Sequence, residues 1–136
     1  MSNIEQTLSI IKPDAVERNL ENQIKDMFKN KGFNIINDKK IKIAKSEAEQ
    51  FYKVHETKPF YNDLCTYLSS GPIVVMVLEK ENAVLGNREL MGATKPEDAA
   101  EGTIRKKYGI SIDKNSVHGS DSVENAKIEI DFFFKD

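Results

Sequence analysis

The sequence predicts an α/β sandwich, in which helices cover the faces of a small β-sheet. Two observations support this fold class. Segments with apolar residues at every second position alternate along the chain with segments of helical spacing. Residues 73–78, with the sequence IVVMVL, are apolar throughout, which is typical of a central strand covered on both faces. The 136 residues are expected to form a single domain over 1–136, because about two-thirds of the unfolded surface can be buried at this length.

The first predicted elements are a strand and a helix. Residues 6–11 are rich in β-branched side chains, and Pro13 removes a backbone donor just beyond them, so we expect a strand that runs into a loop. This places Lys12 at a strand end. Apolar residues recur at helical spacing over about 22–30, and Gly32 follows where a left-handed cap is favoured. That segment is therefore predicted to be an amphipathic helix.

The middle of the chain predicts a second strand and two further helices. Residues 33–43 carry apolar side chains at spacing two, which indicates a strand with one buried face. Ser46 and Glu49 have the spacing of a capping box, so a helix is expected to begin there. Pro59 interrupts this helix, and a shorter helix is expected over about 61–69.

The last third of the chain is predicted to be mainly helical. Asn82 can cap a helix that Gly92 ends, and residues 103–108 form one or two helical turns. Asp121 or Ser122 caps the final helix. Strands and helices in this order fit a ferredoxin-like βαββαβ arrangement, an antiparallel four-stranded sheet with covering helices. The first and third strands of such a fold lie side by side at its centre.

The composition excludes several classes of function. A net charge of −2 argues against a dedicated nucleic-acid-binding protein with a broad basic surface. No segment approaches the ~20 uninterrupted apolar residues of a membrane span, and residues 1–7 lack the pattern of a signal peptide, so a cytoplasmic location is expected. Cys65 is the only cysteine and lies in an apolar stretch, which favours a buried thiol over a nucleophile or a metal ligand.

The segment 115–122, NSVHGSDS, is the strongest candidate for chemistry. We expect His118 to lie in a tight loop at a helix entrance. A neutral histidine can act as a nucleophile when a partner on one ring nitrogen determines which nitrogen attacks, and Ser120 and Glu129 are candidates for that orienting role. The alternative is a structural histidine, which is the commoner fate of a histidine beside a glycine.

A phosphorylated histidine would need cations and hydroxyls around the transferring group. Arg88 and Arg105 can supply bidentate contacts, Thr94 a hydroxyl, and Lys12 a contact to a sugar or a phosphate. The competing interpretation is that the arginines are solvated charges on helix surfaces, that Thr94 satisfies its own turn, and that Lys12 points to solvent.

Several fragments together resemble nucleoside diphosphate kinases in order and spacing. They are Ile11-Lys12-Pro13-Asp14, Pro59-Phe60-Tyr61, Ser70-Gly71-Pro72, Gly102-Thr103-Ile104-Arg105 and Asn115 to Ser122. The similarity covers essentially the whole chain, and the His-Gly-Ser-Asp loop preceded by Asn115 is its most specific part.

The resemblance implies that His118 takes the terminal phosphate from a nucleoside triphosphate and gives it to a nucleoside diphosphate in the same site, which is ping-pong chemistry. It also implies the nucleotide contacts: Lys12 and Asn115 to the sugar, Arg88, Arg105, Thr94 and His55 to the phosphates, Tyr52 beside His118, and Phe60 and Ile112 around the base. His55 can equally be a surface residue. Stacking reads few base atoms, so broad base and sugar specificity is expected.

The same resemblance implies Mg²⁺ as the cofactor, held mainly through the nucleotide phosphates rather than by protein ligands, and a homo-oligomer, tetramer or hexamer. The chain departs from the family at Leu20-Glu21-Asn22, where a glycine is usual, and at Lys106 and Lys107, where an acidic residue is common.

Two other functions stay open: a nucleotide-sensing module without transfer, and a phosphohistidine phosphatase. A P-loop kinase is disfavoured, because no Gly-x-x-x-x-Gly-Lys-Ser/Thr is present.

Overall fold

A computed structural model describes residues 4–53, 56–93, 95–110, 116–120 and 122–134. Its strands are β1 (Ile4–Ile11), β2 (Asn34–Ile41), β3 (Ile73–Glu81) and β4 (Val117–Gly119). They form one antiparallel sheet in the order β2-β3-β1-β4. This order confirms the predicted ferredoxin-like arrangement, with the first and third strands paired at the centre of the sheet.

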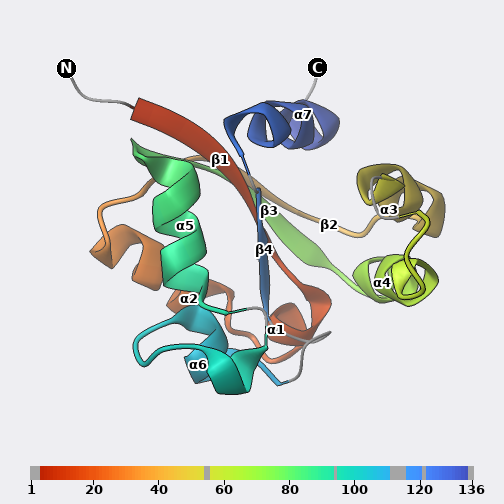
Figure 1. Ribbon diagram of the computed structural model, residues 1–136, viewed down its shortest axis with the longest axis horizontal. Coiled ribbons are helices and arrows are strands. Elements are labelled where there is room, and N and C mark those ends of the chain that lie inside the picture. The colour runs from red at the N-terminus through yellow and green to blue at the C-terminus, as the bar shows by residue number, and fades with distance from the viewer. Residues whose placement is uncertain (1–3, 54–55, 94, 111–115, 121, 135–136) are drawn as a thin grey trace.

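Helices cover both faces of the sheet (Figure 1). They are α1 (Pro13–Glu17), α2 (Glu21–Asn30), α3 (Lys45–Phe51), α4 (Tyr61–Leu68), α5 (Ala83–Met91), α6 (Ile104–Tyr108) and α7 (Val123–Phe134), with a short 3₁₀ turn at Pro96–Asp98. Helices α1, α2, α5 and α6 pack on one face, and α3, α4 and α7 pack on the other. Within the described ranges, no helix is long and apolar enough to cross a bilayer.

The apolar run of β3 serves both faces of the sheet. Val74, Met76 and Leu78 join the core beneath α2 and α5, whereas Ile73 and Val75 join the core beneath α4 and α7. Side chains alternate between faces along a strand, so a strand buried on both sides must be apolar at every position. The interpretation of 73–78 as a central covered strand is therefore confirmed.

Strand β2 lies at the edge of the sheet and is more exposed than its apolar spacing suggested. The two best buried residues of the predicted strand, Phe33 and Ile43, lie just outside it, and Ile36 is 51 % exposed. A bulge between Ile35 and Asn37 shifts the register against β3. An extra residue turns the following side chains to the other face, which interrupts the spacing of two.

Some predicted helix ends are wrong. Helix α3 begins before Ser46, with Ala44 as the N-cap residue, and the Ala44 backbone N–H donates to Glu47 Oε1 at 3.0 Å instead of pairing Ser46 with Glu49. Asn82 precedes α5 without a side-chain cap. Ser122 is the cap of α7 in the described part, since its Oγ accepts from the Asn125 N–H at 3.1 Å. Several residues offer similar capping groups, and packing decides between them.

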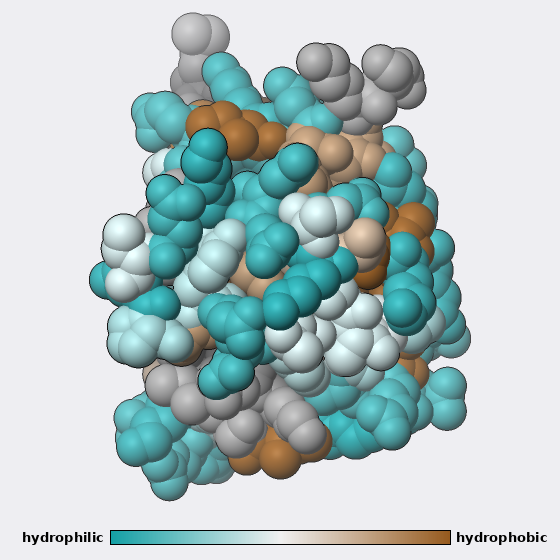
Figure 2. All heavy atoms as spheres, turned by 90° about the vertical axis from the view of Figure 1, so that its right-hand side faces the viewer, coloured by the Kyte–Doolittle hydropathy of each residue, from teal (hydrophilic) through white to brown (hydrophobic). Residues whose placement is uncertain are grey.

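The face that carries α3, α4 and the end of α7 is mostly hydrophilic (Figure 2). Apolar residues appear there as separate small areas between charged and polar ones. Single apolar side chains of this kind are normal on a protein surface. This face therefore shows no broad apolar area.

Candidate active site

His118 lies at the middle of β4, where it pairs with Ile10 of β1. We expected a tight loop, but three residues are too few to give a strand pattern in a sequence. Pairing with β1 creates this strand, from Ser9 opposite Gly119 to Ile11 opposite Val117. The histidine side chain is 22 % exposed, so a ligand in solvent can reach it.

The histidine ring contacts a carboxylate to which a neighbouring hydroxyl also donates. His118 Nε2 lies 3.1 Å from Glu129 Oε1 of α7, and Ser120 Oγ donates to the same oxygen at 2.9 Å. Ser120 Oγ in turn accepts from the Leu8 N–H of β1 at 3.3 Å. An ionised carboxylate only accepts, so Nε2 carries the proton and Nδ1 keeps its lone pair. Within the described part of the chain, Nδ1 makes no hydrogen bond.

Two aromatic rings of the α3 end pack against the histidine. The Phe51 and His118 ring centroids are 5.2 Å apart at 72°, and those of Tyr52 and His118 are 6.1 Å apart at 86°. Phe51 also contacts Phe132 and Phe133 of α7. Tyr52 was among the predicted site residues, but Phe51 was missed. Its position next to Tyr52 in the sequence was the only available signal.

Tyr52 is buried, with 5 % of its surface exposed. Burial and the nearby Glu129 charge both raise the pKa of its phenol, because each disfavours a phenolate. The side chain is therefore neutral at physiological pH. A neutral phenol can donate a hydrogen bond but cannot act as a base.

The raised pKa of Tyr52 predicts a pH effect on stability. A phenol that holds its proton more tightly in the folded state contributes fully below the unfolded pKa of about 10, and this contribution is lost as the pH rises further. Tyr52→Phe cannot ionise. Urea unfolding of both proteins at pH values from about 8 to about 11 is expected to show a smaller alkaline loss of stability in the variant. Parallel pH profiles would contradict this assignment.

Arg105 of α6 is a buried cation beside the histidine strand. It is 8 % exposed, and its guanidinium donates to Gly92 O and Val117 O, both at 3.0 Å. Its Nε is buried and has no hydrogen-bond partner among the described residues. Burial lowers the pKa of Arg105 to about 10, which still leaves it charged at neutral pH. The interpretation as a solvated surface charge is wrong for this arginine.

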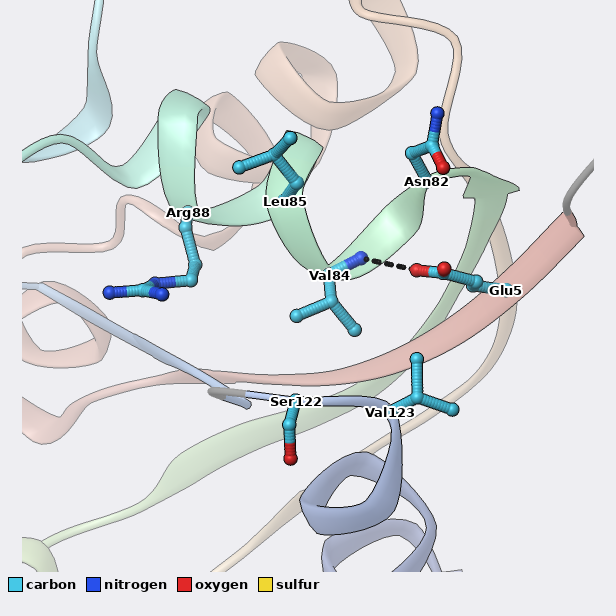
Figure 3. A pocket seen from close by; sticks show the side chains of 7 residues that line it. All are labelled: Glu5, Asn82, Val84, Leu85, Arg88, Ser122 and Val123. Atoms are coloured by element: carbon cyan, nitrogen blue, oxygen red, sulfur yellow. Dashed lines mark hydrogen bonds between the residues drawn. The ribbon is translucent and has the colours of Figure 1, made fainter.

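Arg88 of α5 is exposed and lines a surface hollow of about 260 Å³. The other lining residues are Glu5, Asn82, Val84, Leu85, Ser122 and Val123. Figure 3 shows the Arg88 side chain extending away from Glu5, whose Oε1 accepts from the Val84 N–H at 3.2 Å. Ser122 connects this hollow to the segment that follows His118. Among the described residues, Arg88 forms no hydrogen bond or ion pair with His118.

Lys12 is buried at the end of β1, and its backbone N–H donates to Ser116 O at 2.8 Å. It therefore lies next to the start of β4 and is not the solvent-exposed lysine of the competing interpretation. Phe60 precedes α4 and is 47 % exposed. The other predicted contacts, His55, Thr94, Ile112 and Asn115, fall outside the described residues.

Gly119 is required by close packing against α5. A Cβ atom at this position would lie 2.2 Å from Asn87 Nδ2 and 2.7 Å from Met91 Cε. Gly119→Ala is expected to lower the free energy of unfolding by about 1–3 kcal/mol, because the wholly buried Asn87 has little room to move. Gly71→Ala is the matched control, since its Cβ would meet Pro13 Cβ at 3.7 Å. Equal stability of the two variants in urea unfolding would contradict this packing argument.

Comparison with known proteins shows the family of the chain. The family model described as nucleoside diphosphate kinase matches residues 5–136. The chain is 60 % identical over 131 residues to a nucleoside diphosphate kinase of Campylobacter hominis and 56 % identical to one of Geotalea uraniireducens, with 96 % of both chains covered in each case.

Solved structures show the same similarity. A crystal structure of the Aquifex aeolicus nucleoside diphosphate kinase superposes with a TM-score of 0.95 at 41 % identity, covering 97 % of this chain and 96 % of that one. The enzyme from Encephalitozoon cuniculi gives 0.93 at 38 % identity, covering 97 % and 90 %. The chain therefore belongs to the nucleoside diphosphate kinase family, enzymes that transfer phosphate between nucleoside tri- and diphosphates.

Proposed function

We propose that this enzyme works by a ping-pong mechanism with His118 as the nucleophile. The supporting observation is the hydrogen-bonded chain from His118 Nε2 to Glu129 and Ser120, which leaves Nδ1 with its lone pair. Nδ1 attacks the terminal phosphorus of the triphosphate, the bond to the bridging oxygen breaks, and the diphosphate leaves. Glu129 stabilises the positive charge that develops on the ring.

The second half-reaction reverses the first with another nucleotide. A terminal phosphate oxygen of the incoming diphosphate attacks the phosphorus on Nδ1, the phosphorus–nitrogen bond breaks, and neutral His118 is restored. No proton need leave the site, because Nε2 keeps its hydrogen bond to Glu129 throughout. Ser120 would hold this carboxylate in position through both steps.

We further propose that Arg105 and Arg88 bind the phosphates, together with Thr94 and His55. Arg105 supports this role best, because a buried guanidinium with an unpartnered Nε among the described residues is stabilised by an anion. Lys12 and Asn115 would hold the sugar, with Tyr52 lining the site. Phe60 and Ile112 would enclose the base, and the exposed Phe60 ring suits stacking. Broad base and sugar specificity follows from such contacts.

Magnesium would accompany the nucleotide. Within the described ranges, no three His, Cys, Asp or Glu side chains gather as a metal site. Arg88 and Arg105 are cations, so these donors suit phosphate, whereas the phosphate oxygens are ligands that Mg²⁺ favours. When bound, Mg²⁺ neutralises charge on the phosphate chain.

We also propose a homo-oligomer, a tetramer or a hexamer. This rests on the family resemblance and on Ile36, which is exposed on the edge strand β2. Light scattering of the purified protein distinguishes a monomer from these assemblies. A cytoplasmic location stays a prediction.

A labelling experiment tests the mechanism. The protein is mixed with Mg²⁺ and ATP labelled on the terminal phosphate, isolated, and then given GDP. We expect a label that is labile in acid and stable in alkali, and that moves to GDP as labelled GTP. Release of inorganic phosphate without GDP would favour the phosphatase instead. Transfer between free nucleotides with no label on folded protein would overturn the covalent mechanism.

A further inference from the structure

A buried carboxylate, that of Asp14, lies where several segments meet next to the active site. Its side chain is 3 % exposed and belongs to α1. The Tyr67 hydroxyl of α4 donates to Asp14 Oδ1, and the Asp14 backbone N–H donates to the same hydroxyl at 2.9 Å. Ser116 Oγ donates to Asp14 Oδ2 over a long 3.4 Å, and Arg18 Nη2 lies 3.6 Å from that oxygen. Asp14 thus connects α1, α4 and the residue before β4.

Arg18, which contacts Asp14, also connects this cluster to a fourth segment, α6. Its guanidinium also donates to the carbonyl oxygen of Tyr108, at the end of α6. A carboxylate that is removed from water is costly unless its oxygens are bonded. Here a phenol, a hydroxyl and a guanidinium surround it. Burial and the Asp14 hydrogen bond both raise the pKa of Tyr67, which keeps the phenol a donor.

Ser116 has an unusual backbone conformation. It is wholly buried and has a φ of +75°, a left-handed value that residues other than glycine rarely adopt. Two contacts hold it: its carbonyl accepts from the Lys12 N–H at 2.8 Å, and its hydroxyl donates to Asp14. Val117 and His118 follow directly in β4. The conformation of Ser116 therefore sets how the chain enters the strand that carries the histidine.

We propose that Asp14 is a positioning residue for phosphate transfer: its carboxylate holds Ser116 in the left-handed conformation and thereby places Lys12 and His118 relative to each other. This inference rests on the proposed role of His118. The contacts account for Asp14 in the Lys-Pro-Asp fragment, for which the sequence offered no role.

The test compares Asp14→Asn and Tyr67→Phe in single-turnover phosphorylation by labelled ATP with Mg²⁺. Asparagine keeps the shape but loses the charge, and phenylalanine removes the hydroxyl that donates to Asp14. We expect Asp14→Asn to form phosphohistidine on the order of 10- to 100-fold more slowly, and Tyr67→Phe to be intermediate. The KM for ATP should change less than the rate. The control is Tyr61→Phe, in the same helix, whose hydroxyl donates instead to Glu49 O on the surface.

A rescue experiment separates positioning from simple stabilisation. Glycine adopts a positive φ at no steric cost. Adding Ser116→Gly to Asp14→Asn should therefore recover part of the phosphorylation rate that Asp14→Asn loses. As single variants, the Ser116→Gly protein should form phosphohistidine faster than the Ser116→Ala protein. Both variants lose the hydroxyl, but a positive φ is unfavourable only for alanine. If Asp14→Asn does not fold, the comparison of Ser116→Gly with Ser116→Ala still tests the proposal.

The outcomes are distinct. Unchanged phosphorylation in Asp14→Asn, or Ser116→Gly no faster than Ser116→Ala, would overturn the positioning role while wild-type labelling leaves the phosphohistidine mechanism intact. A slow Asp14→Asn with no rescue by Ser116→Gly would also overturn it. A wild-type protein that takes no label would overturn the mechanism and this inference with it.

Discussion

His118→Gln is expected to lower kcat for phosphate transfer from ATP to a second nucleoside diphosphate by at least about 10⁴-fold. Glutamine can still donate a hydrogen bond to Glu129, but its amide nitrogen has no lone pair that can attack phosphorus. Because His118 is partly exposed at 22 % and contributes little to either core, the stability should change little. A coupled assay of GTP formation and urea unfolding measure the two effects.

Glu129→Gln is the matched variant for this prediction. It keeps the nucleophile but weakens the partner of Nε2, so the loss of kcat should be smaller than in His118→Gln. If His118→Gln retained activity comparable to that of Glu129→Gln, the histidine would be a structural residue. The nucleophile would then have to be sought elsewhere in the chain.

Arg105→Gln is expected to lower kcat/KM by about 10²- to 10³-fold, because it removes the buried cation that we propose to bind the phosphate as it gains charge in the transition state. It should also cost about 1–3 kcal/mol of stability, since Gly92 O and Val117 O lose charged donors. Steady-state kinetics and urea unfolding report these two effects separately.

The control for Arg105 is its neighbour Lys106, which is exposed on the same helix. Lys106→Gln should leave both quantities near the wild-type values. Arg105→Lys keeps a charge without the planar fork, and we expect an intermediate kcat/KM. A destabilised Arg105→Gln with unchanged kcat/KM would mean that the guanidinium only supports the backbone of β4.

The sequence by itself determined the fold class and the family. The apolar run 73–78 predicted a central strand, because the alternate side chains of such a strand pack into the cores on both faces of the sheet. In the structure, residues of this run belong to both cores. Gly32 and Gly92 marked helix ends, and both adopt the positive φ that such caps favour. These features are local, since each depends on residues within a turn or a strand.

Only the tertiary structure decided how the site is built. Strand β4 exists because it pairs with β1, and the contact between His118 and Glu129 joins two elements. Burial turns Arg105 from a helix-surface charge into a buried cation, and Asp14 connects segments 102 residues apart. Spacing along a chain determines local periodicity, whereas burial and long-range pairing depend on which elements pack together, so these contacts arise only in the folded protein.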